Sequence, residues 1–198
     1  GGPRRLGVFA VFERAAEVDR PAADGRYPTL AGVAEPLDVA GALAGALIDR
    51  WSPDLLAATP KGEGARLEAL RITRRAMCLS NEERDDCLHT LDSVAAMKDR
   101  WAGMGVAGRK RLAAGGRFGA ALKLLGAIDP GLAAAIATDV RTLSGQHGGL
   151  SPLPLLDGDR LVAAGLKPGP RFKVLLEQVY DAQLEGRVGD AGAALALA

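Results

Sequence analysis

Apolar residues recur every three or four positions along most of this chain, and no stretch alternates convincingly between apolar and polar residues. A period of three to four places side chains on one face of an α-helix, whereas a half-buried β-strand needs a period of two. The spacing therefore predicts an all-α fold, with helices over residues 3–19, 37–50, 65–78, 81–99, 106–114, 117–127, 130–143, 158–164 and 170–185.

The composition favours a globular protein whose helices pack closely. Of the 198 residues, about a third are Ala or Gly and only 4% are aromatic, so the core must consist mainly of Leu, Val and Ala. No apolar run reaches the roughly 18 residues of a membrane span. There is no signal-peptide pattern, and only Cys78 and Cys87 are cysteines. We therefore expect a cytoplasmic protein with two semi-buried free thiols and no membrane partner.

Segments rich in Gly, Pro and Ser, which interrupt helices, divide the chain into three parts. Breaker-rich segments over 20–36, 51–64 and 144–154 predict loops or linkers. The expected domains are an N-terminal helix and linker over 1–36, a helical body over 37–143 and a small helical tail over 144–198. The chain begins with Gly rather than Met, which favours a fragment whose upstream portion is missing.

Three local signals set helix ends. Ser80 followed by Glu83 forms a capping box, which predicts the start of the helix over 81–99. Asp157 is expected to cap the next helix of the tail. Gly165 is expected to end that helix in the left-handed conformation, before a tight turn into the helix over 170–185.

Residue types that carry hydrolytic or metal chemistry are scarce. The chain has two histidines, His89 and His147, and contains no nucleophile elbow, phosphate-binding loop or Cys-x-x-Cys pair. Two cysteines nine residues apart, without neighbouring histidines, make a poor zinc site. We therefore expect no catalytic residue and no metal ligand in this chain.

Basic residues are concentrated in one stretch of a chain whose net charge is only +1. Seven of them are opposed by Asp99 alone between positions 98 and 123: Lys98, Arg100, Arg109, Lys110, Arg111, Arg117 and Lys123. Such a stretch is typical of a surface that binds a phosphate backbone. A solvated basic face is the alternative.

The turn over 165–170 carries a second basic group. Lys167, Arg171 and Lys173 flank the start of the following helix, where unpaired amides and the helix dipole favour an anion. The turn could therefore seat a phosphate. The alternative is a helix–helix turn that only packs.

The same residues carry a resemblance to a known family. Residues 153–176, LPLLDGDRLVAAGLKPGPRFKVLL, and 182–186, AQLEG, closely resemble the C-terminal end of bacterial tRNA nucleotidyltransferases, the CCA-adding enzymes and their poly(A) polymerase relatives. Residues 79–84 (LSNEER) and 109–112 (RKRL) resemble two helix segments in the body of that family. The similarity covers about residues 37–198.

The family's body often resembles a His-Asp phosphohydrolase domain, and here the ligands are missing. The resemblance implies a metal-binding pair at positions 48 and 49, where the chain has Ile48 and Asp49. Further histidines are implied near positions 62 and 94, which are Gly62 and Val94. One carboxylate is too few ligands for a divalent cation. The resemblance therefore implies a degenerate body that serves as a scaffold.

The resemblance implies a tRNA-binding C-terminal portion of a CCA-adding enzyme. In that family an N-terminal head holds Mg²⁺ and transfers nucleotides from CTP or ATP, and nothing in this chain resembles it. The chain alone is expected to be inactive and without a cofactor, with tRNA as its partner. The parent enzyme could add CCA, CC or A. A phosphohydrolase relative and a non-catalytic helical interaction module are the alternatives.

Overall fold

The computed structural model describes residues 27–51, 53–146, 148–167, 169 and 171–198. The described residues form helices and no strand, which confirms the all-α prediction. The helices are α2 (Pro28–Gly32), α3 (Val39–Arg50), η1 (Pro53–Leu56), α4 (Pro60–Met77), α5 (Asn81–Asp99), η2 (Trp101–Gly103), α6 (Val106–Ala114), α7 (Phe118–Ile128), α8 (Pro130–Ser144), α9 (Gly158–Ala163), α10 (Arg171–Leu184) and α11 (Ala191–Leu197). The helix expected over 3–19 lies outside the described residues. Among the described helices, none combines the length and the apolar character that a membrane crossing requires.

The helices pack as two compact units. Unit 1 contains the described residues up to 102 together with 116–137, and unit 2 contains 103–115 together with 138–198. Helix α6 thus packs with the C-terminal helices, although α5 and α7 on either side of it in the sequence belong to unit 1. The domain division expected from the sequence stays a prediction.

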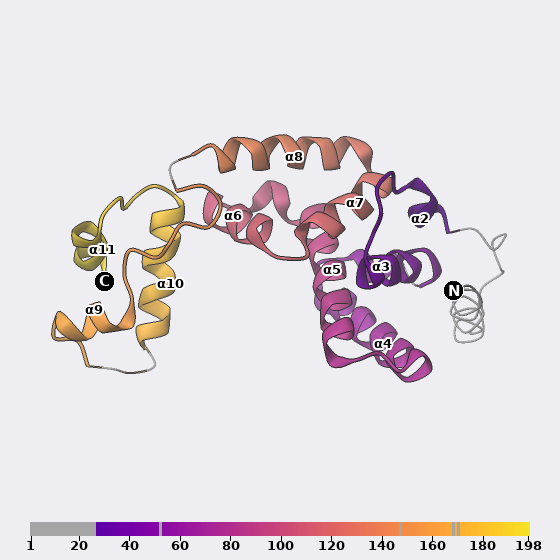
Figure 1. The fold of residues 1–198 in the computed structure, drawn as a ribbon, viewed down its shortest axis with the longest axis horizontal. Coiled ribbons are helices and arrows are strands. Elements are labelled where there is room, and N and C mark those ends of the chain that lie inside the picture. Colours follow the sequence, from indigo (N-terminus) through magenta and orange to yellow (C-terminus); the bar gives the residue numbers. More distant parts are fainter. Residues whose placement is uncertain (1–26, 52, 147, 168, 170) are drawn as a thin grey trace. The chain divides into compact units, whose positions relative to one another are not determined.

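Helix α5 forms the centre of unit 1 and contacts α3, α4 and α7 (Figure 1). It begins as predicted: the Ser80 side chain accepts from the Glu83 amide at 3.1 Å, and the Glu83 carboxylate accepts from the Ser80 amide at 2.8 Å. Its Leu91 and Val94 are fully buried. The capping box and this apolar face together define the longest helix among the described residues.

Helix α2 corrects the loop expected over 20–36. Tyr27, the residue before the helix, provides no side-chain cap. Instead, the Asp49 carboxylate on α3 accepts from the amides of Thr29 at 3.0 Å and Leu30 at 3.3 Å. A carboxylate from another helix therefore stabilises the free amides at the start of α2, and no residue within the segment itself signals this.

Helix α4 begins five residues earlier than predicted, because Thr59 and Pro60 start a helix instead of interrupting one. The Thr59 side chain accepts from the Gly62 amide at 3.3 Å, and Pro60 occupies the first helical turn, where its missing amide costs nothing. Gly62 is buried, and a Cβ there would lie 2.0 Å from the Ala57 carbonyl oxygen. The Asp54 carbonyl oxygen in η1 would also lie only 2.8 Å away, so the close approach of η1 and of Ala57, which follows it, requires glycine.

Unit 2 is built around α10. In Figure 1, α9 and α11 lie on one side of α10 and α6 lies on the other, and all three contact it. Its apolar cluster consists of four buried residues, Leu156, Leu161, Val179 and Ala194. Helix α11 was not expected from the sequence; it is capped by Asp190, whose carboxylate accepts from the Ala193 amide at 2.8 Å.

The turn between α9 and α10 forms as predicted at its first end. Asp157 caps α9 by accepting from the Arg160 amide at 2.9 Å. Gly165 adopts the left-handed conformation with φ +89°, and the Gly165 and Leu166 amides donate to the carbonyls of Val162 and Leu161 at 2.9 and 3.1 Å. This pair of hydrogen bonds is a Schellman motif, which requires a positive φ and therefore favours glycine.

Candidate functional site

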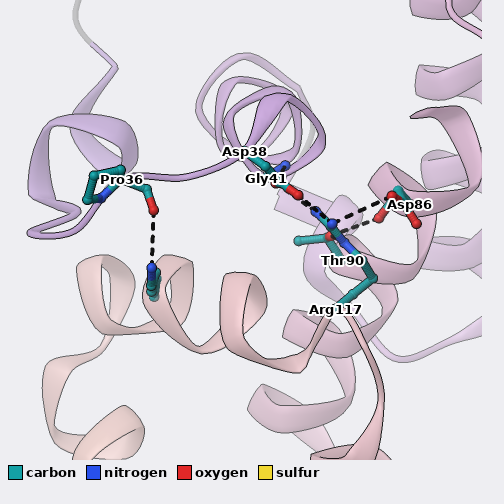
Figure 2. A network of polar contacts seen from close by, with 7 residues as sticks. Pro36, Asp38, Gly41, Asp86, Thr90 and Arg117 are labelled. Atoms are coloured by element: carbon teal, nitrogen blue, oxygen red, sulfur yellow. Dashed lines mark hydrogen bonds and ion pairs between the residues drawn. The ribbon is translucent and has the colours of Figure 1, made fainter. Parts of the chain in front are cut away.

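Arg117, one of the predicted RNA-binding residues, joins three helices of unit 1 (Figure 2). Its guanidinium donates to both Asp38 carboxylate oxygens at 2.5 and 2.8 Å and to the Thr90 hydroxyl at 3.0 Å. Asp86 lies 3.6 Å away, and only 15% of the Arg117 side chain is exposed. The hydrogen bonds from Arg117 hold the pKa of Asp38 down at about 2. Arg117 thus ties the starts of α3 and α7 to α5.

Three other basic residues of the predicted stretch lie in unit 1. Lys123 on α7 contacts the Glu35 carboxylate at 3.0 Å and the Pro36 carbonyl at 3.1 Å. Lys98 lies 3.4 Å from Asp99 at the end of α5, and Arg100, the residue that follows that helix, is exposed. Arg100 forms no described ion pair, but its charge acts on Asp99: the Ala58 amide, and after it Lys98 and Arg100, hold the pKa of the Asp99 carboxyl below its usual value.

The remaining three residues of the stretch lie on α6, in unit 2. Arg109 contacts the Asp139 carboxylate at 2.9 Å, and Arg111 contacts Asp181 at 2.7 Å while its guanidinium lies 5.0 Å from the centre of the Tyr180 ring. Lys110 between them is buried. Acidic residues distant in the sequence thus offset most of the positive charge of the stretch, and its seven residues do not all belong to one unit.

The second predicted group is exposed at the turn between α9 and α10. Lys167, Arg171 and Lys173 all lie at the surface. Lys173 is 3.9 Å from Glu177 on the same helix, a distance typical of a weak surface pair. Within the described residues, neither Lys167 nor Arg171 has a carboxylate partner. All three lie between the end of α9 and the first turn of α10, and the role of all ten basic residues in RNA binding stays a prediction.

The positions expected to hold a metal in a His-Asp domain have structural roles here. Asp49 caps α2, Gly62 allows the close contact with η1, and Val94 is fully buried on α5. No cluster of three or more His, Cys, Asp or Glu residues suited to a metal ion occurs in the described part of the chain. These contacts do not test the prediction that the body has no metal chemistry.

The two cysteines have different surroundings, although both were expected to be semi-buried. Both are free; Cys78 is exposed at the end of α4, and Cys87 is buried in α5. Burial raises the pKa of the Cys87 thiol to about 12, so this group stays protonated and inert at neutral pH.

Sequence reasoning missed an open groove between the second half of α4 and the start of α5. Four arginines line it, Arg71, Arg74, Arg75 and Arg84, together with leucines of both helices. The spacing of basic residues along 66–75 was visible in the sequence. The groove itself was not, because it forms only when two helices meet.

No protein-family model matches this chain, no curated protein is significantly similar to it, and no solved structure resembles it significantly. The resemblance to tRNA nucleotidyltransferases therefore rests on the residues quoted under Sequence analysis.

Proposed function

We propose that this chain binds tRNA as the C-terminal portion of a CCA-adding nucleotidyltransferase, and that it does so in the cytoplasm. The observation that carries the proposal is the exposed turn between α9 and α10. This turn lies within residues 153–176, which carry the resemblance, and presents Lys167 and Arg171 without a described carboxylate partner. Exposed cations without a described carboxylate partner are suited to phosphate oxygens.

In this proposal, the turn contributes more to tRNA binding than the basic stretch over 98–123 does. Arg109, Arg111 and Arg117 already bond carboxylates, and a phosphate would have to compete with those partners. Lys167 and Arg171 need not give up such a contact. Binding through phosphates would depend little on base sequence and would weaken steeply with salt, because each contact releases condensed counterions.

The test compares two double variants of the 198-residue chain that lose the same charge. Lys167→Gln with Arg171→Gln should weaken tRNA binding and reduce the slope of the log–log salt dependence by up to about 1.4–1.8, since each phosphate contact contributes roughly 0.7–0.9. The control is Lys61→Gln with Arg187→Gln, at side chains that are 78% and 57% exposed and already paired with acidic residues. Equal affinity and equal slope in both variants would refute the role of the turn.

In this proposal, the N-terminal head domain of the family carries out catalysis. No part of this chain resembles that domain. Purified protein should incorporate neither CTP nor ATP into tRNA, because Mg²⁺ and the nucleotides would be held by that head. An incorporation assay with labelled CTP and ATP tests this. Incorporation that stops when Mg²⁺ is chelated would contradict the proposal.

Of the alternatives, a helical interaction module is favoured by one specific observation, the open groove between α4 and α5. Its lining combines leucines with arginines. A phosphohydrolase gains no such support, because the Asp49 carboxylate is engaged with the amides of α2.

A further inference from the structure

The groove between α4 and α5 follows one face of α4 over about two helical turns. Its lining residues on α4 are spaced at i, i+3, i+4, i+7 and i+8: Leu67, Leu70, Arg71, Arg74 and Arg75. At 1.5 Å per residue, this stripe is about 12 Å long, and Cys78, which follows the helix, also lines the groove. Arg84, Asp85 and Leu88 at the start of α5 form the other wall, and the groove has a volume of about 800 Å³. This spacing is that of a helix face packed against another helix.

The floor of the groove is apolar and partly uncovered. Leu70 and Leu79 are 2% and 9% exposed and belong to the core, whereas Leu67 is 51% exposed. A single exposed leucine needs no explanation, but here it continues an apolar surface that Leu88 and the buried leucines form together. Covering that surface would remove apolar area from water.

The rim of the groove carries an excess of positive charge. Arg71 is bonded to Glu68 at 2.6 Å, and Arg84 to Asp85 at 2.5 Å. In the described residues, Arg74 and Arg75 have no carboxylate partner. Two unpaired guanidinium groups beside an apolar floor are complementary to a ligand with an apolar face and flanking carboxylates.

We propose that this groove binds an acidic amphipathic helix of a partner protein. The partner would present apolar side chains at i, i+3 or i+4, and i+7 to the leucines and would place Glu or Asp beside Arg74 and Arg75, a helix-in-groove mode of recognition. Guanidinium groups bind carboxylates with directed hydrogen bonds, so the rim would set the orientation of the partner helix. The proposal is independent of tRNA binding.

A single-stranded RNA is the less suitable occupant. RNA recognition by a groove usually stacks bases on aromatic side chains, and none of the described lining residues is aromatic. Arg74 and Arg75 also lie in the last turn of α4, where basic residues complement the helix dipole and so stabilise the helix. Because their substitution changes stability as well as charge, the unfolding midpoint of each variant below is measured before binding is compared.

The probe is a fluorescein-labelled peptide of about fourteen residues, four helical turns, with Leu on one face and Glu flanking it. Its control has the same composition with the Leu positions scrambled. In fluorescence anisotropy, Leu67→Glu should weaken binding of the first peptide at least about tenfold, as loss of an interface anchor does. Leu153→Glu, at a leucine that is 89% exposed in unit 2, should leave the affinity unchanged.

The rim is tested in the same assay. Arg74→Gln with Arg75→Gln should weaken binding about threefold to tenfold at low salt and less at high salt, as for two partly exposed ion pairs. Lys61→Gln with Arg187→Gln should not change it. Equal binding of the scrambled peptide, or no effect of either groove variant, would overturn the proposal.

Two further outcomes would assign the groove to another occupant and overturn the proposal as well. One is a homodimer in analytical ultracentrifugation that Leu67→Glu dissociates. The other is tRNA that displaces the peptide and loses affinity in the Arg74→Gln, Arg75→Gln variant. The Lys167→Gln, Arg171→Gln variant should bind the peptide normally, so failure of tRNA binding and failure of peptide binding can be told apart.

Discussion

Arg117 and Asp38 are 79 positions apart in the sequence, and their side chains form two parallel hydrogen bonds of 2.5 and 2.8 Å. The sequence indicated that Arg117 was part of a basic surface. In the fold it fixes the start of α3 against α5 and α7 (Figure 2). A basic residue that is needed for the fold cannot be tested for RNA binding by simple substitution.

Arg117→Gln should lower the free energy of unfolding by about 2 kcal/mol, since it removes charge-assisted hydrogen bonds from a side chain that is 15% exposed. Arg117→Lys should recover only part of this loss, because an ammonium cannot form the two parallel bonds to Asp38. Urea unfolding followed by circular dichroism measures both. Wild-type stability in Arg117→Gln would show that the network contributes nothing.

Acid should weaken the same contact. The pKa of Asp38 is about 2 in the folded protein, below its ordinary value of 3.8, so the ion pair contributes stability above about pH 4 and loses it as the pH falls through 2. The Asp38 side chain is 55% exposed, so solvent screening keeps this contribution below about 1 kcal/mol.

Asp38→Asn keeps a good helix cap for α3 but removes the titrating group. Between pH 4 and pH 2 the wild-type protein should therefore lose more stability than Asp38→Asn does, as measured by urea unfolding at each pH. Parallel curves for the two proteins would contradict the assignment.

Gly62 and Gly64 on α4 provide a matched pair. Gly62→Ala should destabilise the protein by at least about 2 kcal/mol, because the new methyl group would lie 2.0 Å from a backbone oxygen that cannot move without η1. Gly64→Ala should stabilise it by about 0.5–1 kcal/mol. A Cβ at position 64 would meet no atom within 4 Å beyond its own helix backbone and chain neighbours, and alanine is the better helix former. Thermal unfolding of both variants checks the opposite signs.

Cys78, the residue that follows α4, has a φ of +54°. Residues other than glycine rarely adopt this left-handed backbone conformation. Cys78→Gly should therefore raise the unfolding free energy by about 0.5–1 kcal/mol. Cys78→Ala is the control: it also removes the thiol but keeps the Cβ strain, so it should not be stabilising. A stabilisation of the same size in both variants would point to the thiol instead.

Local signals in the sequence located many helix ends, because both partners of a cap lie within a few residues. Ser80 with Glu83, and Gly165 with Leu166, are such cases. The start of α2 could not be predicted, since its cap is Asp49 on another helix. Thr59 and Pro60 were interpreted as a break, although the same residues begin a helix when a cap hydrogen bond forms.

The candidate sites show a similar limit. A count of charges along 98–123 cannot reveal that Asp139 and Asp181, far along the chain, lie beside Arg109 and Arg111. The end of α9 at Gly165 was predictable because its geometry depends on adjacent residues. The groove between α4 and α5 required the packing of two helices and was not predictable from either one.

The packing of α6 on α10 has a consequence for the order in which the protein can fold during synthesis. Residues 106–114 are synthesised before α10, which starts at position 171. At about 5–20 residues per second, α6 waits several seconds for the helix that covers it. Unit 1 can close around α5 and α7 during that interval, so α6 of the nascent chain stays uncovered until α10 has been synthesised.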